Sequence, residues 1–146
     1  MKIAVGSDMK NHVTDVVVEE LKKMGHEVAI FGALVETPAM WSKVAIDVAQ
    51  KVASGTYDQA VLFCWTGTGI SLAANKVKGI RAALCNDAET ARGARKWNDA
   101  NILAMSLRTV SEQVAKEMLE AWFSTGPSTD EEDVACIEFL KLAEEQ

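Results

Sequence analysis

The chain has few of the residues that build metal and disulfide sites. Its cysteines, Cys64, Cys85 and Cys136, form no C-x-x-C pair, and only two histidines accompany them. An odd cysteine count without such spacing is typical neither of a zinc site nor of a disulfide framework. We therefore expect no metal and no disulfide.

A long apolar run and an excess of basic residues are also missing. No apolar stretch approaches the length that crosses a bilayer, and Met1 leads directly into a strand-like segment. We expect a cytoplasmic, unprocessed protein with no membrane partner. The formal net charge of −6 comes largely from the acidic C-terminal stretch, which disfavours nucleic acid as a partner.

What the chain does contain is ordinary for one globular domain. Its 146 residues are 49% hydrophobic and 25% charged, which suffices for a core without covalent staples. No repeat or low-complexity linker divides it. We predict a single domain over residues 1–146, with an α/β core over 1–125 and a C-terminal helical extension over 126–146.

Short β-rich segments alternate with segments of helical spacing. Strands are expected at 2–6, 27–31, 59–64, 81–84 and 102–105, and helices at 13–24, 44–52, 71–76, 89–96 and 112–123, with a break around Pro38 and a last helix after Thr129. Apolar strands separated by helices form a parallel sheet covered on both faces. The pattern predicts an α/β fold, a three-layer α-β-α sandwich with a five-stranded parallel Rossmann-like sheet.

Ligands of such a sheet bind beyond the carboxyl ends of its strands. After the third expected strand, the segment C64-W-T-G-T-G69 exposes backbone N–H groups at the start of a helix, which favours an anion. The spacing of a Walker loop is absent. On the glycines alone, a tight strand-to-helix turn is an equally good interpretation.

Cys64 adds chemistry to this loop. A thiol that faces amide donors at the end of a buried strand can act as a base, and the same amides can hold an enediolate oxygen. The alternative is a small buried hydrophobic residue, which is the interpretation we favour for Cys85 and Cys136.

The ordered motifs resemble one enzyme family over most of the chain. The stretch C64-W-T-G-T-G-I-S-L-A-A-N-K76, followed by G79-I-R-A-A-L-C85, resembles the type B ribose-5-phosphate isomerases and the related galactose-6-phosphate isomerase subunits. The resemblance includes the opening M1-K-I-A-V-G-S-D8, the segment A94-R-K-W-N-D-A-N101 and the region of Arg108, and it fades after about Gly126.

This resemblance implies an aldose–ketose isomerase that acts on a sugar or sugar phosphate through an enediolate, without a metal or organic cofactor. It implies a homodimer, or a dimer of dimers, with sites that form across the subunit interface. The implied catalytic residues are Cys64, Thr66 and Asp8. The implied substrate-binding residues are Trp65, Gly67, Thr68, Gly69, Ser71, Trp97, Asn98 and Arg108.

The departures from the family pattern concern the substrate. Met9 and Trp97 stand where the family usually carries histidines, and the second of these histidines normally assists opening of the sugar ring. A substrate that is already open, such as a tetrose derivative, needs that histidine least, so we expect ribose 5-phosphate to be a poor substrate. Trp65 replaces a glycine and reshapes the pocket. Asp130–Asp133 replaces phosphate-binding cations, which leaves Arg108, with Lys10 and His12 as further candidates.

Two other functions stay open at this point. The chain can be a non-catalytic sugar-phosphate binder or partner subunit of the same fold, although a pure binder does not need a thiol at the anion loop. A flavodoxin-like nucleotide or flavin protein rests on fold analogy alone.

Overall fold

The protein is described from a computed structural model, which covers residues 1–35 and 39–146. Its centre is a five-stranded sheet in which all paired strands run parallel. The strands are β1 (Lys2–Ser7), β2 (Glu27–Gly32), β3 (Gln59–Cys64), β4 (Ala82–Leu84) and β5 (Ile102–Ser106), and they lie in the order β2-β1-β3-β5-β4. The predicted α/β sandwich with a five-stranded parallel sheet is confirmed.

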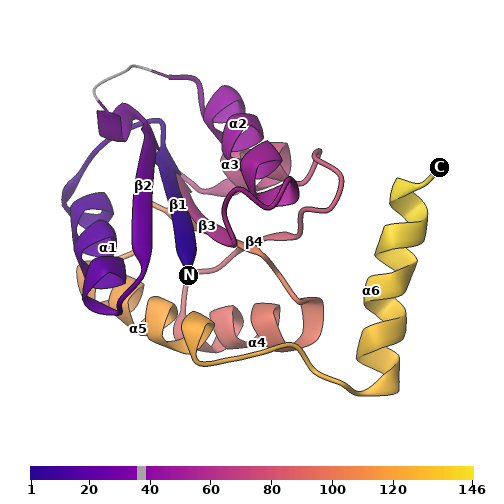
Figure 1. The fold of residues 1–146 in the computed structure, drawn as a ribbon. Helices are drawn as coiled ribbons and strands as arrows, with labels where there is room; N and C mark the ends of the chain where they lie inside the picture. Colours follow the sequence, from indigo (N-terminus) through magenta and orange to yellow (C-terminus); the bar gives the residue numbers. More distant parts are fainter. Residues whose placement is uncertain (36–38) are drawn as a thin grey trace.

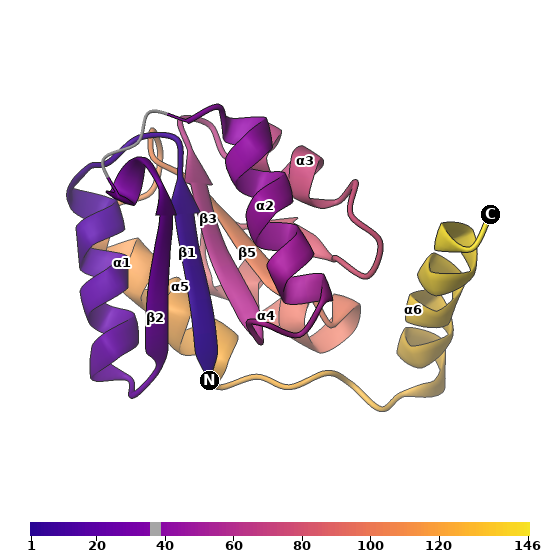
Figure 2. The ribbon, with the colours of Figure 1, turned by 45° about the horizontal axis from the view of Figure 1, so that its top comes forward.

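Helices cover both faces of the sheet (Figure 1). One face carries α1 (His12–Lys23), α4 (Ala88–Asn98) and α5 (Glu112–Phe123), and the other carries α2 (Trp41–Ala53) and α3 (Thr68–Ala74). A short 3-10 helix, η1 (Ala33–Val35), follows β2, and the expected break at Pro38 lies outside the described residues. Figure 2 shows α2 and α3 side by side on their face.

Two apolar layers, one on each side of the sheet, hold this arrangement together. The strands send alternate residues to opposite faces, so Val61 and Phe63 pack toward α1, α4 and α5, whereas Leu62 and Cys64 pack toward α2 and α3. Trp122 of α5 is 1% exposed, and its Nε1 donates a hydrogen bond to Oε1 of Gln59 at 2.8 Å. Odd- and even-numbered residues of β3 thus pack in different apolar layers, one on each face of the sheet.

Two helices begin three residues earlier than the sequence pattern predicts. The helix expected from Ser71 begins at Thr68, and the helix expected from Val44 begins at Trp41. Gly67 causes the first difference, because its left-handed backbone (φ 79°) ends the turn abruptly and allows the helix to start at the next residue. Trp41 therefore lies in the first turn of α2, and Thr68 and Gly69 lie in the first turn of α3.

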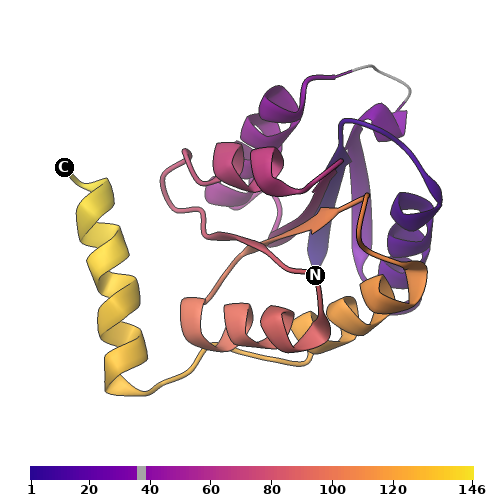
Figure 3. The same cartoon turned by 180° about the vertical axis from the view of Figure 1, so that it is seen from behind.

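The last helix, α6 (Glu131–Glu144), stands apart from the sheet (Figures 2 and 3). Its attachments to the body include the ion pair Lys78–Glu145 at 2.9 Å and the hydrogen bond from the Gly79 N–H to Glu144 Oε2 at 2.9 Å. Phe139 and Leu142 are 75% and 60% exposed. An isolated helix with exposed large apolar residues offers a surface for another protein chain.

Within the described residues, no helix combines the length and the apolar character that a membrane span requires. The cytoplasmic location stays a prediction from the sequence.

Candidate active site

Three polar or nucleophilic side chains lie in one row across the carboxyl edge of the sheet. Cys64 pairs with Ser106 in the register of β3 and β5, and Asp8 follows Ser7, whose register partner in β3 is Phe63, the residue before Cys64. Cys64 packs toward α2 and α3. Ser106 has the parity of Ala104, which packs on the same face, and Asp8 continues the parity of Ala4 one residue beyond the end of β1. Neighbouring strands lie about 4.8 Å apart. Asp8 and Cys64 are therefore neighbours across the ends of β1 and β3.

The strand order makes this the expected binding crevice of the fold. From β1 the chain continues into α1 on one face, and from β3 it continues into α3 on the other face. Ligands of open parallel sheets bind where such connections diverge. Asp8 and Cys64 stand on the two sides of this point.

The backbone path of the loop after Cys64 requires glycine at position 67. A Cβ atom on Gly67 would lie 2.5 Å from Cδ1 of Leu84 and 3.0 Å from the carbonyl carbon of Met105, and the residue has φ of 79°. The loop thus passes directly over the ends of β4 and β5 before α3 begins. The first backbone N–H groups of α3, at Thr68, Gly69 and Ile70, have no partner inside the helix.

Backbone and hydroxyl hydrogen bonds fix the start of the loop. The Leu107 N–H donates to the carbonyl of Cys64 at 3.0 Å, and the Arg108 N–H donates to the carbonyl of Trp65 at 2.9 Å. The buried Ser106 Oγ donates to the same Trp65 carbonyl at 3.0 Å. The sequence placed Ser106 directly after the fifth expected strand but assigned it no role. Its buried hydroxyl at the end of a strand is the signal that identifies it.

The predicted substrate-binding hydroxyls lie along this loop. Thr66 Oγ1 and Thr68 Oγ1 are 2.9 Å apart, and both residues are exposed. Ser71 Oγ instead donates to the carbonyl of Thr68 at 3.0 Å. The two threonines thus face solvent, whereas the Ser71 hydroxyl is engaged by its own helix.

Asp8 is electrostatically unusual. Its Oδ1 atom is buried and, among the described residues, it has no hydrogen-bond partner. Burial raises the pKa of the Asp8 carboxyl above its ordinary value, against the opposing effect of a backbone hydrogen bond. A buried acceptor without a partner is rare and costly, so it marks a place where a ligand hydroxyl can donate.

The three candidate cationic side chains differ in whether they already have an ion-pair partner. Nζ of Lys10 pairs with Asp15 at 2.7 Å, and Nδ1 of His12 lies 3.1 Å from Oε1 of Glu112. Arg108 is exposed, and within residues 1–35 and 39–146 it has no ion-pair partner. Of these three side chains, Arg108 is the one available to an anionic ligand.

Trp97 and Asn98 lie at the opposite edge of the sheet. They form the last turn of α4, which runs from the end of β4 back toward the beginning of β5, so they sit near the amino ends of the strands. Trp97 is 52% exposed, so it does not fill the core. One chain alone therefore does not bring these two predicted substrate-binding residues to Cys64.

A charged network holds the turn that carries Trp97 and Asn98. Nη1 of the buried Arg95 donates to Asp99 Oδ1 at 3.0 Å and to the Ala100 carbonyl at 2.6 Å. Arg81 Nε donates to the Asp99 carbonyl at 2.9 Å. Among the described residues, Asp99 is the only non-glycine residue with a positive φ (44°). The two arginines hold a backbone conformation that is uncommon for residues other than glycine, although aspartate tolerates it better than most.

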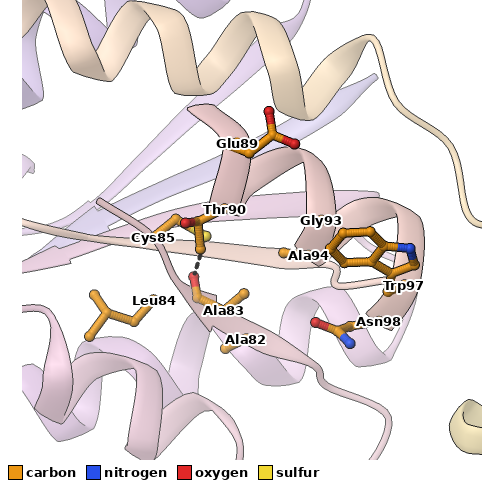
Figure 4. Close-up of a pocket in the computed structure, with 10 residues that line it drawn as sticks. All are labelled: Ala82, Ala83, Leu84, Cys85, Glu89, Thr90, Gly93, Ala94, Trp97 and Asn98. Atoms are coloured by element: carbon orange, nitrogen blue, oxygen red, sulfur yellow. Dashed lines mark hydrogen bonds between the residues drawn. The ribbon is translucent and has the colours of Figure 1, made fainter. Parts of the chain in front are cut away.

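A cavity of about 530 Å³ runs beside Trp97 and Asn98, between β4 and α4, and its lining does not include Cys64 (Figure 4). Figure 4 shows Trp97 and Asn98 at one end and Leu84 at the other, with Cys85 between them. Burial, followed by the charge of Asp87, raises the pKa of the Cys85 thiol to about 12. Cys85 is thus a buried neutral thiol, as the sequence interpretation expected. The same interpretation is wrong for Cys136, which is exposed on α6, the helix that stands apart from the sheet.

The positions of the His, Cys, Asp and Glu side chains determine whether the chain can bind a metal ion. In the described part of the chain, no group of three or more His, Cys, Asp and Glu side chains is arranged to hold a metal ion.

Comparisons with known proteins agree on one family. A model of the family described as Ribose/Galactose Isomerase matches residues 3–137. The chain is 36% identical to the D-erythrulose-4-phosphate isomerase of Pectobacterium atrosepticum, over 84% of this chain and 82% of that protein. It is 35% identical to the 4-deoxy-4-sulfo-D-erythrose isomerase of Clostridium sp. (strain MSTE9), over 100% of this chain and 92% of that protein.

A solved structure shares the whole fold. The ribose-5-phosphate isomerase B of Clostridium thermocellum superposes with a TM-score of 0.92 and 35% sequence identity. The superposition covers 99% of this chain and 98% of the other.

Proposed function

The chain belongs to the ribose/galactose isomerase family and is an aldose–ketose isomerase, and we propose that its substrate is a four-carbon sugar with an anionic group on C4. The observation that carries the proposal is Trp97, which stands where the family resemblance leads one to expect a ring-opening histidine. An indole cannot transfer a proton to a ring oxygen.

A four-carbon sugar with a blocked C4 does not need ring opening. A five-membered sugar ring closes through the C4 hydroxyl of an aldose, and a phosphate ester or a sulfonate at C4 removes that hydroxyl. Such a sugar is therefore available in its open form. Two relatives support this substrate class, because their names state activity on D-erythrulose 4-phosphate and on 4-deoxy-4-sulfo-D-erythrose.

Cys64 is the proposed base. Its thiolate takes the proton from C2 of the aldose, and the electron pair moves to give an enediolate with negative charge on O1. The O2 hydroxyl proton passes to O1, and the Cys64 thiol returns the first proton to C1 as C2=O forms, which gives the ketose and restores the thiolate. The position of Cys64 at the binding crevice, 5% exposed, supports this role.

The groups around Cys64 have complementary tasks in this proposal. Backbone N–H groups of Thr68 and Gly69 stabilise the enediolate oxygen. Asp8 Oδ1 accepts a hydrogen bond from a substrate hydroxyl, which supplies the partner that this buried atom lacks. Thr66 binds a second hydroxyl. Arg108 attracts the anionic group on C4, and Trp65, 53% exposed, bounds the pocket beside it.

The complete site needs a second copy of the chain. We propose a homodimer in which Trp97 and Asn98 of one subunit reach the Cys64 edge of the other, because they lie too far from it within their own chain. The exposed apolar side chains of α6 support an assembled state. A monomer that does not change with concentration in sedimentation equilibrium would contradict this part. In each subunit of this dimer, residues 1–125 would form the α/β core and residues 126–146 the C-terminal helical extension.

Steady-state kinetics test the substrate. We expect kcat/KM to be highest for erythrose 4-phosphate or for 4-deoxy-4-sulfo-D-erythrose, and the two compounds distinguish a phosphate from a sulfonate. Ribose 5-phosphate should be converted at least about 10²-fold less efficiently, since acid–base assistance is worth about that much. An efficiency near 10⁴ M⁻¹s⁻¹ or higher with ribose 5-phosphate would overturn the proposed substrate class.

Variants of the acidic C-terminal stretch, Asp130–Asp133, provide a second test with ribose 5-phosphate. The Ser128 N–H donates to the Lys96 carbonyl at 2.7 Å, so the stretch that leads to Asp130 and Asp133 passes the end of α4 near Trp97. Trp97→His alone should therefore recover little activity toward ribose 5-phosphate. A variant that also carries Asp130→Arg and Asp133→Arg should recover more. Absence of turnover with all these sugars would favour the non-catalytic subunit.

A further inference from the structure

Trp41 is a large aromatic residue at the carboxyl edge that belongs to neither core layer. It is the first residue of α2, which packs along α3, and it is 43% exposed. The residues of α2 that do enter the core, such as Val44 and Val48, are 4% and 0% exposed. Trp41 thus leaves much of its apolar surface in solvent at the edge that carries Cys64.

The indole ring of Trp41 lies against the loop after Cys64. A Cβ atom on Gly69 would lie 3.1 Å from Cδ2 and 3.1 Å from Cε3 of Trp41, and 3.3 Å from Cε2. Gly69 is not among the glycines with a positive φ. The backbone therefore accepts any residue at this position, and it is the flat face of Trp41 that occupies the space of a side chain.

This contact places an aromatic wall beside the proposed substrate groups. Gly69 lies next to Thr68 and two residues from Gly67, so the ring stands at the α2 side of the loop that bears the enediolate donors. A rigid indole in this place removes volume that a longer sugar would occupy. Steric limits of this kind discriminate substrates by about 10- to 200-fold for each methylene-sized difference.

We propose that Trp41 is a specificity-determining residue, whose indole ring limits the length of sugar that the Cys64 site accepts. The inference rests on the proposed function, because it concerns the substrate of the same site. It predicts that a smaller residue at position 41 opens the site to five- and six-carbon sugars without loss of the proton-transfer machinery.

The first experiment compares kcat/KM for erythrose 4-phosphate, ribose 5-phosphate and allose 6-phosphate in the wild type, Trp41→Phe and Trp41→Ala. The comparison is repeated in the Trp97→His background, so that a missing ring-opening group does not limit turnover of the longer sugars. We expect the ratio of the longer sugars to erythrose 4-phosphate to rise about 10-fold or more in Trp41→Ala, and by less in Trp41→Phe. Met24→Ala is the matched control, because Met24 is 38% exposed at the far end of α1. It should keep the wild-type ratio.

The outcomes separate this inference from the proposed function. A wild type that converts neither the three sugars nor 4-deoxy-4-sulfo-D-erythrose would overturn the proposed function and this inference with it. An active wild type whose substrate ratio is unchanged by Trp41→Ala, both alone and in the Trp97→His background, would overturn only the role of Trp41.

A second experiment tests the contact without using activity. In the wild type, Gly69→Ala should lower Tm, because its Cβ meets the Trp41 ring. In the Trp41→Ala background the same change should leave Tm unchanged or raise it, since alanine is the better helix former. Identical Tm changes in the two backgrounds would show that the ring does not rest on Gly69 and would overturn the inference.

Discussion

The two edges of the sheet are held in different ways. At the carboxyl edge, the row of Asp8, Cys64 and Ser106 is placed by strand register and by backbone hydrogen bonds. At the amino edge, the turn after Trp97 and Asn98 is held by the side chains of Arg95 and Arg81 on Asp99. The first edge is defined by the main chain and the second by charges.

This difference explains why the edges respond differently to substitution. Side chains can change at the carboxyl edge with little effect on the fold, because the sheet itself positions them. At the amino edge, loss of Arg95 removes the donor to the buried Ala100 carbonyl and one of the two arginines on the half-buried Asp99, which is destabilising. We expect the largest losses of activity from the carboxyl edge and the largest losses of stability from the amino edge.

The largest effect should follow Cys64→Ala. Removal of the proposed base should lower kcat by about 10³-fold or more, while the circular dichroism spectrum and Tm stay close to wild type. Cys85→Ala is the control, because its neutral buried thiol takes no part in proton transfer, and kcat should persist. Near-normal turnover by Cys64→Ala would exclude Cys64 as the base.

A complementation experiment tests whether the two edges meet between subunits. Cys64→Ala and Asn98→Ala should each be nearly inactive alone. When both are produced in the same cell in equal amounts, about half of the dimers are mixed, and each mixed dimer has one intact site of two, which gives about a quarter of wild-type activity. No recovery in the mixture would place both residues in one chain's site or exclude Asn98.

Arg95→Ala should give the largest loss of stability. It removes a buried guanidinium that binds both Asp99 and the Ala100 carbonyl, so the free energy of unfolding should fall by about 2 kcal/mol in urea denaturation. Arg92→Ala on the same helix is the matched control. Its ion pair with Glu89 is exposed, so its loss should change stability by less than about 0.5 kcal/mol. Equal losses in the two variants would show that the amino edge does not depend on this network.

Asp8→Asn should give the smallest effect on stability, and of opposite sign. Burial raises the pKa of the folded Asp8 carboxyl, so the ionised form weakens the folded state at neutral pH. The amide variant should unfold at slightly higher urea concentration at pH 7. This advantage should shrink as the pH falls through the folded-state pKa and vanish below the ordinary value of 3.8, where the carboxyl is neutral in both states. Equal stability of the two proteins at pH 7 would show that burial of the ionised Asp8 carboxylate does not destabilise the folded state.

Local sequence features predicted most of the elements, because hydrophobic periodicity and turn residues act over short distances. The expected strand at 59–64 is confirmed as β3, and the expected helix at 112–123 is confirmed as α5. The starts of α2 and α3 were wrong by three residues each, because the capping positions Met40 and Gly67 carry none of the usual side-chain signals. The motif around Cys64 indicated the family, which the comparisons confirm.

Only the tertiary structure decided which of the predicted site residues lie together. The strand order β2-β1-β3-β5-β4 placed Asp8 beside Cys64, and the direction of α4 carried Trp97 and Asn98 to the opposite edge. The contact between Trp41 and Gly69 likewise joins two segments that no local pattern connects. Such relations depend on packing between segments distant in the chain, and the spacing of residues within one segment contains no information about them.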